Sequence, residues 1–176
     1  MAALLVLGSA GLALGARGIV SKSLGLYMEN TEISPTNTAG EITGLLVRVG
    51  ARQIVMDYAE PGKLTGLHFS LVIHGVHHPF RLPVRTEGVY RILQAGHTAW
   101  NRHQYETKDR IKAERVAWRQ LLRWVQAQLA MIDAGMVETR EVFLPYVVDE
   151  ESGKTLFEVF EVTRFKALPA ASGEKR

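Results

Sequence analysis

The sequence has no cysteine among its 176 residues. This absence excludes disulfide bonds, thiolate metal sites and cysteine nucleophiles. The chain also lacks the GxGxxG and GxxxxGKS/T phosphate loops, the GxSxG nucleophile elbow and the HExxH zinc motif. No catalytic or cofactor motif is recognisable, and the sequence therefore favours a protein that is not an enzyme and has no cofactor.

A long apolar run is also missing. Met1–Ala16 is apolar, but sixteen residues fall short of the ~20 that span a bilayer as a helix. A secretory signal has a positively charged residue before its apolar run, and this sequence has none there. We therefore expect no stable membrane span, and we interpret residues 1–27 as an apolar extension ahead of a natural start at Met28. An export signal or membrane anchor at Met1–Ala16 is the alternative.

The overall composition is that of a globular protein, with 47% hydrophobic and 22% charged residues. The length suits one domain with a sizeable core. We expect a single domain over residues 28–168 and a flexible tail over residues 169–176.

Hydrophobic patterning predicts an α+β fold. Thr38 and Glu41 have the spacing of a capping box, and an apolar stripe over residues 42–49 indicates an amphipathic helix that ends at Gly50. Three strand patterns follow, separated by turns, and predict a three-stranded antiparallel meander. Two prolines in the third pattern place it at a sheet edge. These strand patterns cover residues 53–58, 67–74 and 79–84.

A long amphipathic helix is predicted over residues 108–134, after a short helix from Thr86 and a loop over residues 94–107. Its apolar stripe spans four turns. We expect one face of the meander to pack against this helix and the N-terminal helix. A short helix is predicted over residues 139–144, whereas the pattern over residues 155–165 fits a helix or a strand.

The charge is unevenly distributed. The chain carries +3 overall, but residues 81–123 contain ten basic and four acidic side chains. Five of these cations recur at steps of four, three, four and four along one face of the long helix: Lys108, Lys112, Arg115, Arg119 and Arg123.

This basic row predicts a nucleic-acid interface, because cations at helical spacing can follow a phosphate backbone. Further arginines lie ahead of the row, and exposed aromatic rings could stack on unpaired bases. The alternative is a solvated face whose arginines pair with Glu114 or with acidic residues of the C-terminal third. Beyond the row, the candidate residues are Arg81, Arg85, Trp100 and Trp124.

Three histidines around one turn, His74, His77 and His78, are weak candidates for a metal site. Neutral imidazole side chains that lie close together can bind a transition metal. No acidic residue is adjacent to complete a site, so a polar turn is the simpler interpretation.

Three segments carry a resemblance to a known group of proteins: TAGEITGLLVRVGARQIVMDY, FRLPVRTEGVY and AERVAWRQLLRWVQAQLAMIDAGMVETREVFLPY. Together they cover most of residues 38–146. They resemble small uncharacterised proteins of bacteriophages and prophages, a group with no known activity. The resemblance implies an accessory protein of a mobile element, in the cytoplasm of a bacterial host.

The expected function is non-enzymatic nucleic-acid binding through the basic helix face. One alternative is a protein-interaction module that acts on a host protein or on a second copy of itself, through Trp124 and the basic face. The other alternative is a metal-dependent enzyme at the histidine cluster.

Overall fold

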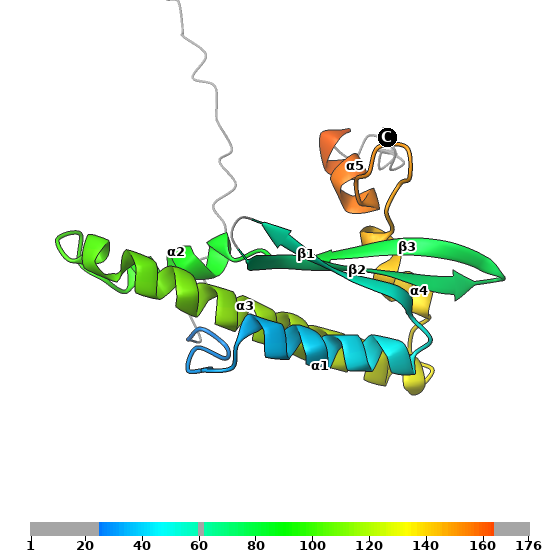
Figure 1. Ribbon diagram of the computed structural model, residues 1–176, viewed down its shortest axis with the longest axis horizontal. Coiled ribbons are helices and arrows are strands. Elements are labelled where there is room, and N and C mark those ends of the chain that lie inside the picture. Colours follow the sequence, from blue (N-terminus) through cyan, green and yellow to red (C-terminus); the bar gives the residue numbers. More distant parts are fainter. Residues whose placement is uncertain (1–24, 60–61, 164–176) are drawn as a thin grey trace, which may run out of the picture.

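The centre of the fold is an antiparallel sheet of three strands in the order β1–β2–β3 (Figure 1). The computed structural model describes residues 25–59 and 62–163. The expected extension and tail therefore lie largely outside the described residues. In chain order the elements are α1 (Pro35–Arg48), β1 (Arg52–Ala59), β2 (Lys63–Ile73), β3 (Val76–Pro83), α2 (Glu87–Ala95), α3 (Arg102–Asp133), α4 (Thr139–Phe143), the 3₁₀ turn η1 (Leu144–Tyr146) and α5 (Leu156–Val162).

The core lies between one face of the sheet and the helices α1 and α3, which confirms the predicted α+β architecture. Alternate residues of β2 and β3 face this core, and the pairs Leu67–Leu82 and Phe69–Phe80 lie opposite each other. The apolar stripe of α3 packs beneath them. The large core residues of α1 and α3 are Ile42, Leu46, Trp118, Leu122, Val125 and Leu129.

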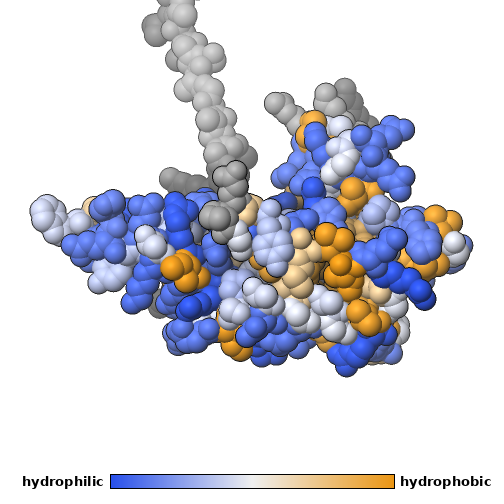
Figure 2. Space-filling view, viewed as in Figure 1, coloured by the Kyte–Doolittle hydropathy of each residue, from blue (hydrophilic) through white to orange (hydrophobic). Residues whose placement is uncertain are grey.

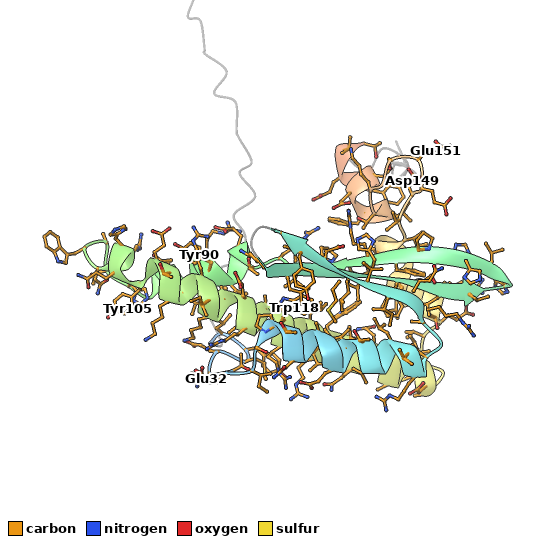
Figure 3. The ribbon with its side chains drawn as sticks, in the orientation of Figure 1. Glu32, Tyr90, Tyr105, Trp118, Asp149 and Glu151 are labelled. Atoms are coloured by element: carbon orange, nitrogen blue, oxygen red, sulfur yellow. The ribbon has the colours of Figure 1, made fainter. Side chains whose placement is uncertain are left out.

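Trp118 is the largest fully buried side chain (Figure 3). Its indole nitrogen donates to the carbonyl oxygen of Leu64 at 3.3 Å. A buried N–H that finds an acceptor avoids the cost of losing its hydrogen bond to water. Trp118 therefore fixes both the depth of α3 beneath the sheet and its rotation about its own axis.

The predicted capping box at Thr38 was wrong. Helix α1 begins at Pro35, and the N-cap is Ser34, whose hydroxyl accepts from the amide of Asn37 at 3.2 Å. Proline suits the first helical position because its missing N–H needs no partner there. Thr38 is instead buried within the helix. Glu41 is consequently free to form an ion pair with another element.

The predicted loop over residues 94–107 is mostly helical. Helix α3 begins at Arg102, so only residues 96–101 separate it from α2. Residues 102–107 carry no apolar stripe, and hydrophobic periodicity therefore gave no signal for a helix there. The ambiguous pattern near the C-terminus resolves as the short helix α5, which begins with a capping box of Thr155 and Glu158.

The sheet has two edges that differ in their surroundings. The third strand lies at an edge, as its prolines predicted. The segment after η1 partly covers this edge, because Phe80 and Val147 form a bridge and the amide of Val148 donates to the carbonyl oxygen of Pro79 at 2.8 Å. The other edge is formed by β1.

An ion pair joins helix α5 to strand β3. Glu158 accepts from the amide of Thr155 at 2.8 Å and forms an ion pair with Arg81. The amide hydrogen bond and the nearby guanidinium lower the pKa of Glu158, against the opposing effect of burial. Because the pKa of Glu158 is lower in the folded state, its carboxylate stabilises the fold at pH values above the usual pKa of glutamate. This contribution is lost as the pH falls through the folded-state pKa.

Phe143 joins α4 to the core. It is fully buried, and its ring lies 5.9 Å from Phe69 and 6.1 Å from Phe80, centroid to centroid. We predict that Phe143→Ala lowers the free energy of unfolding by about 3–5 kcal/mol, because it leaves a cavity. Denaturant unfolding measures this loss. The adjacent exposed Leu144→Ala is the control, with an expected change of at most about 0.5 kcal/mol; equal effects of the two substitutions would contradict the packing described.

Candidate nucleic-acid interface

Three of the five cations of the basic row are held by carboxylates from the N-terminal part of the chain. Lys112 lies 2.9 Å from Glu29, Arg115 lies 2.6 Å from Glu32, and Arg119 lies 2.6 Å from Glu41, measured between side-chain nitrogen and oxygen. Glu29 and Glu32 belong to the loop before α1, which runs beside α3 (Figure 3).

Arg119 is also buried, with 8% of its side chain exposed. Its guanidinium lies between α3 and α1, and its Nε has no hydrogen-bond partner among the described residues. Helices α1 and α3 pack against each other here, so little of the Arg119 side chain is accessible to a nucleic-acid backbone.

The row is therefore not a continuous line of free cations, and this part of the sequence interpretation needs correction. The pairing partners are also not the expected ones, because Glu114 forms an ion pair with Lys63 at 3.1 Å. Lys108 and Arg123 remain, and no carboxylate pairs with either among the described residues. They lie near opposite ends of the row, about 22 Å apart along the helix axis.

Two other candidate residues line a common groove. Arg85, from the segment between β3 and α2, and Trp124, from α3, line a cavity of about 380 Å³ together with Tyr146 and Phe157. The guanidinium of Arg85 lies over the ring of Phe157, at 5.3 Å from its centroid. Trp124 packs edge-on against Phe143 and Tyr146 and is not the exposed aromatic contact that the protein-interaction alternative required.

The loop between α2 and α3 lies at one end of the molecule (Figure 1). A buried carboxylate holds it in place: Asp109 accepts from the side-chain Nε2 of Gln94 at 2.9 Å and lies 2.9 Å from Nε2 of His97. The ring of His97 stacks on Tyr105, with centroids 4.2 Å apart. The predicted loop is thus a short connection that is fixed at its base. Sequence reasoning did not identify Asp109 or His97, because neither belongs to a motif or a periodic stripe.

Trp100 is the most exposed large apolar side chain of the described residues, at 89%. It lies in the α2–α3 loop, directly before the start of α3. The exposed cations Arg91, Arg102 and Lys108 lie on the two flanking helices, and none has a carboxylate partner among the described residues. We call Trp100, Arg102 and Lys108 the hairpin tip. Two of the nine candidates, Trp100 and Lys108, are therefore exposed and lie near the α2–α3 end of the molecule.

The three histidines of the candidate metal site do not converge. His77 and His78 are adjacent in β3, so their side chains point to opposite faces of the sheet. His74 lies in the turn before β3, where its Nε2 is 2.9 Å from a guanidinium nitrogen of Arg140. Within residues 25–59 and 62–163, no three histidine, aspartate or glutamate side chains are grouped so that they could hold a metal ion.

Comparison of the chain with protein-family models, with curated proteins and with solved structures gives no match. None of the helices in the described part of the chain has both the length and the apolar character that a membrane crossing requires.

The ion pairs predict unequal effects of two neighbouring substitutions. We expect Arg119→Ala to lower the free energy of unfolding by about 1–3 kcal/mol, because it removes the partner of Glu41 and leaves a gap between α1 and α3. This loss is smaller than the ~3–5 kcal/mol that the removal of one partner from a fully buried ion pair typically costs, because Glu41 is half exposed. Arg115→Ala breaks a surface pair and should cost ~1 kcal/mol or less. Thermal or denaturant unfolding tests the order, and a larger loss for Arg115→Ala would contradict it.

Proposed function

We propose that the protein is a non-enzymatic nucleic-acid-binding protein, and that the hairpin tip, rather than the basic row, is its contact surface. The observation that carries the proposal is the 89% exposure of Trp100 next to cations that have no carboxylate partner among the described residues. An exposed tryptophan keeps a large ring in contact with water, and tryptophan is enriched at surfaces that a partner covers.

The chemistry of the hairpin tip suits single-stranded nucleic acid. An indole can stack on an unpaired base of any sequence, and flanking cations can bind the phosphates on either side of that base. Arginine adds a planar fork that fits a phosphate. The loop is fixed by Asp109 and His97, so little ordering is required when the tip binds. The proposal therefore includes a preference for single strands over duplexes.

A protein-interaction role is the second candidate, and a different observation favours it. The edge of β1 is open and partly apolar. Neither Trp124 nor the basic row supports that role, because the structure packs or pairs most of those side chains.

The proposal predicts that Trp100→Ala weakens binding to single-stranded oligonucleotides by about 5- to 150-fold, the range expected when one stacking contact of ~1–3 kcal/mol is lost. Fluorescence anisotropy with labelled DNA and RNA measures the affinity. The fold should be unaffected because the side chain is exposed, and unchanged thermal unfolding is the control. Equal affinity of the wild type and Trp100→Ala would overturn the assignment of the tip.

A second prediction separates the hairpin tip from the basic row. The double change Arg102→Ala and Lys108→Ala should make the dependence of log K on log salt shallower by ~1.4, since each phosphate contact on a single strand contributes ~0.7. Arg123→Ala is the matched control: it removes an exposed cation of the same helix that lies about 22 Å from Lys108, and it should leave the slope unchanged. If Arg123→Ala lost binding and the double variant did not, the interface would be the basic row and not the hairpin tip.

A further inference from the structure

The edge formed by β1 is open. This strand pairs with β2 on one side, and no backbone hydrogen bond joins its other side to any segment within the described residues. An open edge presents a row of amide N–H and carbonyl groups that can accept another strand. The opposite edge of the sheet differs, because residues 147–148 partly cover β3.

The open edge is also apolar. Val55 is 56% exposed and Tyr58 is 55% exposed, and the half-buried side chains of Ile54 and Met56 lie between and beside them. Figure 2 shows apolar side chains gathered over β1 and over the neighbouring end of α1, where Val47 is exposed. Proteins commonly protect such edges with lysine, proline or a bulge.

The protection of β1 is incomplete. Gln53 has a positive φ of 50°, and the register with β2 shifts between Arg52 and Val55, which marks a bulge at the start of the strand. A second register shift lies between Asp57 and Tyr58. Beyond the bulge, Val55, Met56 and Asp57 pair with consecutive residues of β2 in regular register. No lysine or proline lies in Ile54–Tyr58. The regular part of the edge therefore remains able to pair.

We propose that β1 pairs antiparallel with β1 of a second copy of this chain, about a two-fold axis at Val55, so that the two sheets form one continuous sheet. This inference does not depend on nucleic-acid binding. A two-fold axis is the commonest symmetry of protein pairs, and it brings the same surface of both copies together. An open strand edge provides both the donors and the acceptors that such a contact needs.

The side chains of β1 fit this register. Opposed residues of an antiparallel pair share a face of the sheet. With Val55 opposite Val55, Ile54 lies opposite Met56 of the second copy, and both of these residues face the core side. Asp57 is the one charged side chain between residues 53 and 57, and it lies two positions from the axis, so the two Asp57 carboxylates are not opposed. The apolar side chains meet one another, and no carboxylate faces a carboxylate.

The absence of cysteine makes the contact directly testable. Directly opposed residues in an antiparallel pair have Cα atoms ~4.5–5.5 Å apart, within the range that a disulfide bridges. Val55→Cys should therefore form a disulfide-linked dimer under mild oxidation, seen on a non-reducing gel at twice the 19.6 kDa mass of the chain and lost on reduction. The matched control is Val72→Cys, which is similarly exposed at 48% but lies on the central strand β2. Equal cross-linking rates of the two variants would overturn the proposal.

A second measurement does not depend on oxidation. Sedimentation of the full chain should give a mass that rises from one chain to two with concentration, and Val55→Lys should shift this equilibrium toward the monomer by at least about tenfold, because a charge would be buried at the two-fold axis. Val72→Lys is the control and should leave the equilibrium unchanged. A single-chain mass for the wild type up to its solubility limit, or equal effects of the two lysines, would overturn the proposal.

Discussion

The structure depends on the burial of one stripe of α3 beneath the sheet. Trp118, Leu122 and Val125 are fully buried there, and the hydrogen bond from the Trp118 indole to Leu64 fixes the rotation of the helix. A helix turns by about 100° per residue, so every other side chain of α3 then has a determined direction. Arg119, the residue after Trp118, points toward α1 and meets Glu41. The ion pairs of the basic row are therefore a consequence of core packing.

This rotation divides the cations of the basic row into two groups. Those in the middle of the helix lie beside α1 and the loop that precedes it, and carboxylates of these segments neutralise them. Lys108 and Arg123 have no carboxylate partner among the described residues and stay exposed, although α1 continues beside α3 as far as Asp133. A cation that is already paired with a protein carboxylate adds little to the binding of a phosphate. The cations of the row that can still bind phosphates are therefore Lys108 and Arg123.

The two proposed contact surfaces are physically distinct. The hairpin tip combines one exposed aromatic ring with unpaired cations, a combination that suits a flexible polyanion. The edge of β1 combines unpaired backbone groups with apolar side chains, a combination that suits another strand. The tip lies on the connection between α2 and α3, whereas β1 is followed in the chain by β2 and pairs with it. A protein that pairs through β1 could therefore present two copies of the tip.

The sequence by itself determined the α+β class, the three-strand meander, the edge position of the proline-bearing strand and the long helix with its apolar stripe. These features depend on local periodicity and on the missing proline N–H, which are properties of short segments. It did not determine the N-cap of α1, since Ser34 and Thr38 both precede apolar positions, or the first turns of α3, which carry no apolar stripe. Only the tertiary structure decided which cations are free. The partners of Lys112 and Arg115 lie 83 residues away in the chain, and charge pairing over such a separation is set by packing, for which helical spacing carries no information.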